Sequence, residues 1–153
     1  MLYYIPIVND PLLTLPGYVL RRASATAQAR LSARLRPLAL RPAEASLLLL
    51  IEAASGLSQS QAGRLLDIQR SNMVAIVLRL ERRGAVERRA VDGRSSKLCL
   101  TRSGRALLAR ARHIIESQEA ALIARVPARL RPSVLPILLA LWKGPDQRHE
   151  EAS

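Results

Sequence analysis

The sequence predicts a mainly α-helical fold with one small β-hairpin, in which a helix-turn-helix directly precedes the hairpin. Residues 58–83 carry apolar side chains at helical spacing, in two short segments that a tight turn separates. Directly after Gly84 the spacing changes to the two-residue alternation of a β-strand. Longer helical patterns at 17–36 and 101–125 flank this unit. Together these observations predict a winged helix-turn-helix framed by longer helices.

The first third of the chain is predicted to contain an apolar arm and two helices. Residues 1–16 are mostly apolar and hold three prolines, so we expect an arm that packs on a partner. Residues 17–36 repeat small and apolar side chains in four-residue steps, which is typical of a helix. Prolines and Gly56 bracket a second helix at about residues 43–54. Its buried side is expected to consist of Leu47, Leu48 and Ile51.

Residues 58–83 are predicted to form the helix-turn-helix. Ser58 begins the pattern S-Q-S-Q, a capping box in which Gln61 returns a hydrogen bond to the cap. This short helix is expected to bury Ala62, Leu65 and Leu66. Ser71 is expected to cap the following helix, which extends to Arg83. The apolar face of that helix consists of Met73, Ile76, Val77 and Leu80, and its other side presents Ser71, Asn72, Ala75 and Arg79.

A hairpin and two helices are predicted to follow. Residues 86–91 and 96–100 pair around an Asp92-Gly93 turn, with Leu98 and Leu100 on one side. Its basic residues are Arg88, Arg89, Arg94 and Lys97, and a solvated strand edge is the favoured role for the first two. Thr101 can cap the next helix, whose seam is suited to pairing with another helix and consists of Leu108, Ala111, Ile115, Gln118 and Leu122. A last helix is expected within 132–143.

The charge of the chain indicates a polyanionic partner. Lysine and arginine total 24 against 12 acids, which gives a formal net charge of +12. Residues 64–112 hold 13 of these cations against four acids. Nearly all are arginines, whose planar guanidinium suits phosphates and guanine edges. Because this stretch contains no aromatic residue on which bases could stack, duplex DNA is favoured over single strands.

The remaining chemistry-bearing residues favour neither an enzyme nor a metal site. The sequence contains no glycine-rich phosphate loop, and no nucleophile has a base at a plausible spacing. His113 and His149 lack partners at ligand spacing. Cys99 alternates with leucines on a predicted strand, where a half-buried packing role is favoured over a redox sensor. We expect no cofactor, no membrane span and a cytoplasmic location, since a single cysteine fits a reducing compartment.

Residues 57–107 resemble the multiple antibiotic resistance regulator (MarR) family of bacterial repressors. The matching motifs are L-S-Q-S-Q-A-G-R-L-L, Q-R-S-N-M-V-A-I-V-L-R-L-E-R-R-G-A-V-E-R-R, D-G-R and L-T-R-S-G. The D-G-R tip followed by L-T-x-x-G is the more specific part, and the flanking helices match in position and character. We therefore expect a single domain over 1–153, with 43–104 as the winged helix-turn-helix and 1–36 and 105–143 as dimerisation helices.

The resemblance implies a homodimer that places its recognition helices in successive major grooves of a pseudo-palindromic operator. Ser71 and Asn72 would meet base edges and phosphates at the start of the recognition helix. Arg70 and Arg79 would approach the DNA backbone or guanine. The residues expected to bind DNA are Arg70, Ser71, Asn72, Ala75, Arg79, Asp92, Arg94 and Lys97.

At the wing tip the resemblance implies that Arg94 enters the minor groove, held in place by Asp92. A purely turn-forming role for Asp92 remains open. Family members commonly release DNA when a small, often phenolic, ligand binds. Tyr18 and Arg22 are the candidates for contact with such a ligand, although packing and surface roles are favoured for both.

The predicted function is therefore a sequence-specific duplex-DNA-binding transcriptional regulator, a repressor that a small ligand releases. Val74, Ala75 and Leu78 give the recognition helix fewer hydrogen-bonding groups than many relatives have there. This leaves open an alternative, in which the winged helix docks a protein partner. A basic peripheral membrane protein is disfavoured because no helix pairs a cationic face with large aromatics.

Overall fold

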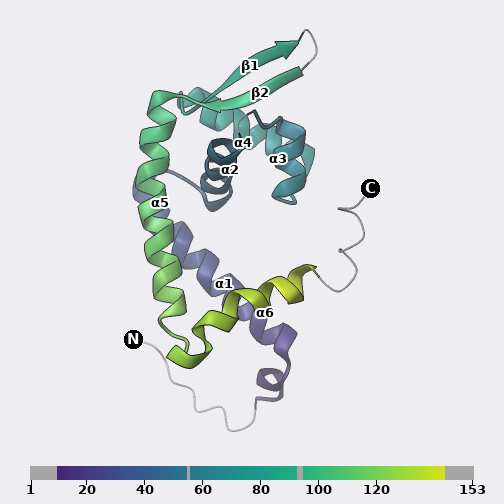
Figure 1. Ribbon diagram of the computed structural model, residues 1–153, viewed down its shortest axis with the longest axis vertical. Helices are drawn as coiled ribbons and strands as arrows, with labels where there is room; N and C mark the ends of the chain where they lie inside the picture. The colour runs from purple at the N-terminus through teal and green to yellow at the C-terminus, as the bar shows by residue number, and fades with distance from the viewer. Residues whose placement is uncertain (1–9, 55, 93–94, 144–153) are drawn as a thin grey trace. The chain divides into compact units, whose positions relative to one another are not determined.

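The computed structural model describes residues 10–54, 56–92 and 95–143 (Figure 1), and the chain divides into two compact units. The first unit ends at Ile114 and the second begins at Ile115, so the boundary falls within the long helix α5 (Arg102–Ile123). The mainly helical fold with one antiparallel hairpin is confirmed. The predicted single domain with separate dimerisation helices stays a prediction.

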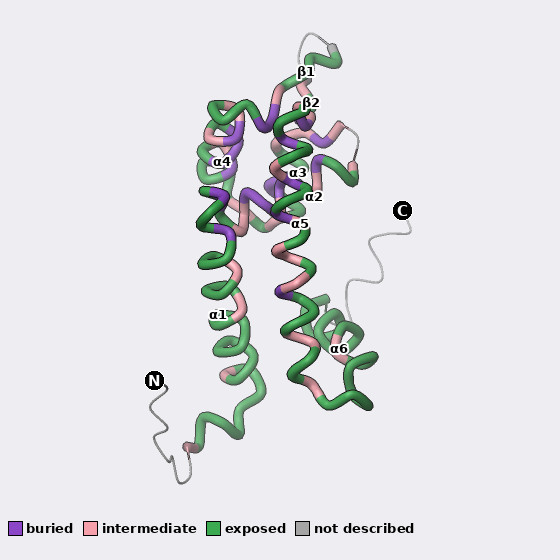
Figure 2. The backbone as a smooth tube through the Cα atoms, turned by 90° about the vertical axis from the view of Figure 1, so that its left-hand side faces the viewer, coloured by how far each residue is buried: buried purple, intermediate pink, exposed green. Residues whose placement is uncertain are grey.

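The first unit begins with a short turn and a long, exposed helix. The turn η1 (Pro11–Thr14) is capped by the Asp10 carboxylate, which accepts a backbone N–H at 2.9 Å. Helix α1 (Pro16–Leu35) agrees with the helix predicted over residues 17–36. Most of α1 is exposed in this chain, and its last residue, Leu35, is buried (Figure 2). The C-terminal end of α1 is therefore the part that joins the core.

A tight corner connects α1 to the second helix. The turn η2 (Arg36–Leu38) ends at Ala39, whose φ of 47° lies in the left-handed region that non-glycine residues rarely adopt. Helix α2 (Pro42–Ala53) begins with a proline, which lacks the N–H that a first helical residue would leave unbonded. Its buried side includes the predicted Leu47, Leu48 and Ile51.

The helix-turn-helix consists of α3 (Gln59–Leu65) and α4 (Arg70–Arg82). The predicted capping box is confirmed, because the Ser58 hydroxyl accepts the Gln61 N–H at 3.2 Å and Gln61 Oε1 accepts the Ser58 N–H at 2.9 Å. The predicted apolar face of α4 is buried, and its residues are Met73, Ile76, Val77 and Leu80.

The prediction that α3 buries Leu65 is wrong. Leu65 is 59% exposed and Leu66 is half-buried, whereas Ala62 and Gly63 are buried. Successive helical residues are rotated by about 100°, so a core direction between Ala62 and Gly63 also receives Leu66 but leaves Leu65 on the flank. The helix has seven residues, and four-residue spacing could not fix its buried direction.

The strands β1 (Val86–Asp92) and β2 (Ser95–Leu100) form the predicted hairpin, with Val86 opposite Leu100 and a bulge between Ala90 and Asp92. Leu98 and Leu100 are buried, as predicted. The hairpin is also joined to the start of the helix-turn-helix, because the Leu98 N–H donates to the Leu57 carbonyl at 2.8 Å.

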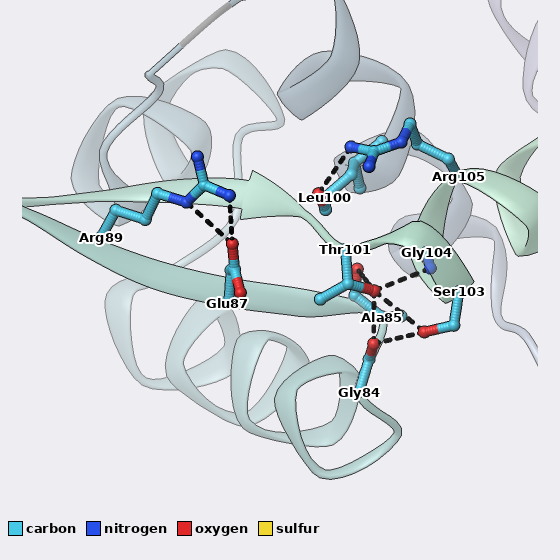
Figure 3. A network of polar contacts seen from close by, with 9 residues as sticks. All are labelled: Gly84, Ala85, Glu87, Arg89, Leu100, Thr101, Ser103, Gly104 and Arg105. Carbon is cyan, nitrogen blue, oxygen red and sulfur yellow. Dashed lines mark hydrogen bonds and ion pairs between the residues drawn. The ribbon is translucent and has the colours of Figure 1, made fainter.

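The start of α5 is pinned to the end of α4 by a compact polar network (Figure 3). The Thr101 and Ser103 hydroxyls reach the Gly84 carbonyl oxygen at 2.5 and 2.6 Å. Thr101 Oγ1 also accepts the Gly104 N–H at 2.9 Å, so Thr101 caps α5 as predicted. Gly84, with a φ of 64°, allows the chain to turn out of α4 at this point.

In the second unit, the end of α5 is followed by the turn η3 (Ala128–Leu130) and helix α6 (Arg131–Lys143). Arg131 joins these elements by donating to the Val126 and Ala124 carbonyls. Large apolar side chains of α6 are exposed in this chain, and they include Leu135 (63%), Leu141 (65%) and Trp142 (76%).

The predicted seam of α5 is the less exposed side of that helix. Its residues Leu108, Ala111 and Gln118 are buried, and Ile115 and Leu122 are half-buried.

We predict that Gly104→Ala destabilises the fold. A Cβ at this position would lie closer to the Ala85 carbonyl oxygen than real Cβ atoms ever do, so the backbone must shift. The expected loss of unfolding free energy is about 1–3 kcal/mol, measured by urea denaturation. Gly17→Ala in α1 is the matched control, because its Cβ meets nothing within 4 Å in the described part of the chain and should stabilise by up to about 1 kcal/mol. Equal effects of the two substitutions would contradict the prediction.

Candidate DNA interface

The first two turns of α4 present a polar, exposed side. Arg70, Ser71, Asn72 and Ala75 are all exposed, while the opposite side of the helix is buried. This orientation is the one that the apolar spacing predicts. The contacts of these residues with DNA stay predictions.

The prediction that Ser71 caps α4 is wrong. The helix begins at Arg70, so Gln69 is the N-cap residue and its carbonyl accepts the Met73 N–H at 2.9 Å. The reason is a tighter turn than the sequence suggests, in which Asp67 adopts a left-handed φ of 50°. Ser71 therefore lies in the first helical turn, where N–H groups have no partner within the helix and can meet a phosphate.

An open cleft of about 340 Å³ lies between α3 and α4. Its lining includes two exposed cations, Arg64 and Arg70, together with the polar Gln59, Ser60 and Gln69. Arg64 was not among the residues predicted to bind DNA, although its place in the basic stretch was visible in the sequence. The cleft brings positive charge to the exposed first turn of α4, as a phosphate-binding surface requires.

Two predicted wing residues fall partly or wholly outside the described residues. Arg94 lies outside them, and so does the side chain of Asp92, so their expected ion pair stays a prediction. Lys97 is described and exposed, and its aliphatic stem lies against the backbone of Gly56. The stem therefore packs on the loop before α3, while the residue remains on the surface of the hairpin.

The arginines of β1 make contacts within the protein. Arg88 Nε donates to Glu81 of α4 at 2.8 Å, and its Nη2 donates to Gln59 of α3 at the same distance. Arg88 therefore joins the hairpin to both helices of the helix-turn-helix. The sequence pattern favoured a solvated position on the strand edge and did not predict these contacts. Arg89 pairs with Glu87 at 2.6 Å, and the hydrogen bond and charge of Glu87 raise the pKa of Arg89 above its ordinary value.

Arg79 contacts a buried carboxylate. Its Nε lies 2.7 Å from Glu44 Oε1, and Glu44 is 4% exposed. Four residues later, Arg83 donates to the carbonyls of Leu38 and Ala39 at 2.9 and 2.7 Å. Sequence reasoning did not identify Glu44 or Arg83 as site residues, since a contact across 35 or more residues leaves no local spacing signal. The predicted DNA contact of Arg79 stays untested.

Tyr18, a candidate for ligand binding, is half-buried on α1. The guanidinium carbon of Arg21 lies 5.3 Å from the centre of its ring, a cation–π distance. Arg22, the other candidate, is exposed. Ligand binding by Tyr18 and Arg22 stays a prediction, and the structure adds Arg21 as the residue that lies over the ring.

Two other kinds of site are absent from the described residues. No group of three or more His, Cys, Asp and Glu side chains there is placed to hold a metal ion. None of the described helices is long and apolar enough to cross a membrane. Cys99 is half-buried, the environment that its strand position predicts.

Similarity to known proteins decides the family. A sequence model described as the MarR family matches residues 40–95. The HTH-type transcriptional repressor Rv2887 of Mycobacterium tuberculosis is 35% identical over 114 residues, which cover 73% of this chain and 82% of that protein. The chain belongs to the MarR family. The family resemblance of the sequence motifs is thereby confirmed.

Solved structures of MarR-like repressors extend the comparison. The transcriptional repressor CouR bound to a 23-mer DNA duplex matches with a TM-score of 0.80 and 34% identity, over 87% of this chain and 96% of that chain. CouR bound to p-coumaroyl-CoA matches with a TM-score of 0.79 and 33% identity, over 90% and 99%. Rv2887 in complex with salicylic acid matches with a TM-score of 0.69 and 33% identity, over 82% and 95%.

We predict that Ser58→Ala destabilises this MarR fold by removing the cap of α3. The change leaves the Gln61 N–H without its side-chain acceptor, at an expected cost of about 1 kcal/mol in unfolding free energy. Denaturant unfolding of the purified protein measures it. Ser60→Ala is the matched control, because Ser60 is exposed within the same helix and its loss should change stability by less than about 0.5 kcal/mol. A larger loss for Ser60→Ala would refute the assignment of the cap.

Proposed function

We propose that this MarR-family protein is a transcriptional repressor that binds a pseudo-palindromic duplex operator as a homodimer. The observation that carries the proposal is the exposed polar side of α4, which directly precedes a basic hairpin in the chain. The similarity to CouR bound to a DNA duplex supports it, with 34% identity over nearly all of that chain. Because the matched family and relatives are named as transcriptional regulators, the proposed role is not enzymatic and its place is the cytoplasm, where a regulator meets bacterial DNA.

In the proposed complex, α4 lies in the major groove with its first turn against the DNA. Arg70 and Ser71 contact phosphates there, and Asn72 bridges an adenine edge. Ala75 contributes an apolar contact to a thymine methyl group. At the hairpin, Lys97 meets the DNA backbone and the sequence position of Arg94 makes it the residue for the minor groove.

The homodimer is proposed from the exposed apolar side chains of the second unit. Leu135, Leu141 and Trp142 are each more than 60% exposed in the single chain, and further leucines of α6 accompany them. Exposed apolar patches of this kind mark protein–protein contacts in soluble proteins. We therefore propose that residues 1–36 and 105–143 pair with their copies in a second chain.

The regulating ligand is proposed to be a small aromatic acid or its coenzyme A thioester. Rv2887 is solved with salicylic acid and CouR with p-coumaroyl-CoA, and both proteins are about one third identical to this chain. Binding of such a ligand is proposed to favour a state with lower affinity for DNA, which is the physical meaning of release. Tyr18 and Arg22 remain the proposed contacts.

A second function, docking of a protein partner through α4, is favoured by one observation. Leu78 is 41% exposed and lies two turns after Ser71 on the same side of α4, where it offers an apolar contact beyond the polar first turn. The DNA experiment below separates the two functions, because a protein-docking module would select no duplex sequence.

Selection of bound fragments from random duplex DNA tests the proposed function. We expect enrichment of a sequence with two half-sites about one helical turn apart, at a dissociation constant of about 10⁻⁸ M or below. The affinity should fall steeply with salt, because several arginines displace counterions from the phosphates. Equal binding of duplex and single strand, or no enrichment, would contradict the proposal. Salicylate and p-coumaroyl-CoA are then added to the preformed complex, and release of the duplex by either one is expected.

We predict that Arg70→Gln weakens duplex binding by about 1–3 kcal/mol and lowers the salt slope by about one unit, because one phosphate contact is lost. Binding titrations at four salt concentrations measure both quantities. Arg30→Gln on α1 removes the same charge from an exposed site outside the helix-turn-helix, so it should leave the slope unchanged once size-exclusion chromatography has shown that the variant is still a dimer. An identical response of the two variants would argue against a contact at Arg70.

A further inference from the structure

Glu44 is a buried carboxylate whose two oxygens are both occupied. Oε2 accepts the backbone N–H of Arg41 at 2.8 Å, which caps the start of α2. Oε1 accepts Arg79 Nε of α4 at 2.7 Å. A carboxylate that is only 4% exposed needs a compensating charge, and Arg79 supplies it. The Glu44 side chain thus joins the first turn of α2 to the third turn of α4.

Arg83 makes a second connection from the same side of α4. It lies four residues after Arg79, one helical turn further on, and donates to the carbonyls of Leu38 and Ala39. These carbonyls belong to the corner between α1 and α2, where Ala39 has its left-handed conformation. The last turn of α4 and its C-cap residue, Arg83, are therefore both hydrogen-bonded to the segment 38–44.

Arg79 also lies on the same side of α4 as the proposed reading residues. It follows Ala75 by four residues and Asn72 by seven, and both spacings bring side chains to one helix face. The segment 38–44 therefore meets α4 immediately beyond the reading side. Because an α-helix turns as one body, a rotation of α4 at this contact would change the direction in which Asn72 and Ala75 point.

From these contacts we infer that Arg79 positions the reading side of α4 through its ion pair with Glu44 and does not bind DNA. The inference rests on the proposed function and names a positioning residue for it. Apolar burial determines which side of α4 is hidden but sets the rotation of the helix only coarsely, because apolar contacts are non-directional. The charge-assisted hydrogen bond from Arg79 to Glu44 is directional and restricts the rotation of α4 more narrowly.

A double-mutant cycle with Glu44→Gln, Arg79→Gln and the double variant tests this role. Affinities are measured for the selected operator and for a scrambled duplex, over a series of salt concentrations. Each single change should weaken operator binding roughly tenfold, and the double change should add little to the larger single effect. Binding of the scrambled duplex and the salt slope should stay those of the parent, since no phosphate contact is lost.

A direct contact of Arg79 with DNA gives the opposite pattern. Arg79→Gln would then lower the salt slope by about one unit and weaken binding of the scrambled duplex as well. The effect of Glu44→Gln on operator affinity would be additive with that of Arg79→Gln. Either result overturns the inference. Partial unfolding is recognised because it weakens both duplexes equally. Arg82→Gln is the matched control, since it removes one exposed charge from the last turn of α4 and its effect should be additive with Glu44→Gln.

The same variants are unfolded without DNA, which separates the inference from the proposed function. Thermal midpoints of the two single variants should fall, and that of the double variant should lie close to the lower of the two. Additive midpoints would show that Glu44 and Arg79 do not act together, whatever the protein binds. If the parent protein selects no duplex, the proposed function fails, and the role of Arg79 in positioning DNA-reading residues fails with it. Non-additive thermal midpoints would in that case still show that the ion pair between Glu44 and Arg79 stabilises the fold.

Discussion

Burial of one face of α4 is the constraint on which the rest of the structure depends. Met73, Val77 and Leu80 are almost completely inaccessible, and burial of each such side chain contributes about 1.5–3 kcal/mol. These three contacts determine which side of the helix is hidden. The side that remains exposed, around Asn72 and Ala75, is the only one that this helix can offer to a partner.

Directional contacts then hold the neighbouring elements in place around α4. The Leu57 carbonyl accepts the Leu98 N–H, so the loop before α3 is hydrogen-bonded to the hairpin. After the C-terminal end of α4, the Gly84 carbonyl oxygen accepts hydrogen bonds from the hydroxyl groups of Thr101 and Ser103 at the start of α5 (Figure 3). The helix-turn-helix, the hairpin and the start of α5 are thus joined by hydrogen bonds, which support the exposed side of α4 from its neighbouring elements.

The arginine side chains of this MarR-family chain have two different roles. Arg64 and Arg70 are exposed beside the cleft between α3 and α4, where they can face a phosphate backbone. Others donate to groups of the protein itself, and these include Arg79, Arg83, Arg88, Arg105 and Arg112. Net charge therefore agrees with the proposed partner, duplex DNA, but it overstates how many guanidinium groups are available to bind it.

The sequence by itself determined the helices, the hairpin, the buried face of α4 and the family, because periodicity, turn residues and motifs act over short stretches of chain. It misplaced Leu65 and the cap at Ser71, since both depend on the exact geometry of one turn. Only the tertiary structure decided that Arg79 meets Glu44. That pairing crosses 35 residues and arises from the packing of two helices, so local spacing carries no record of it.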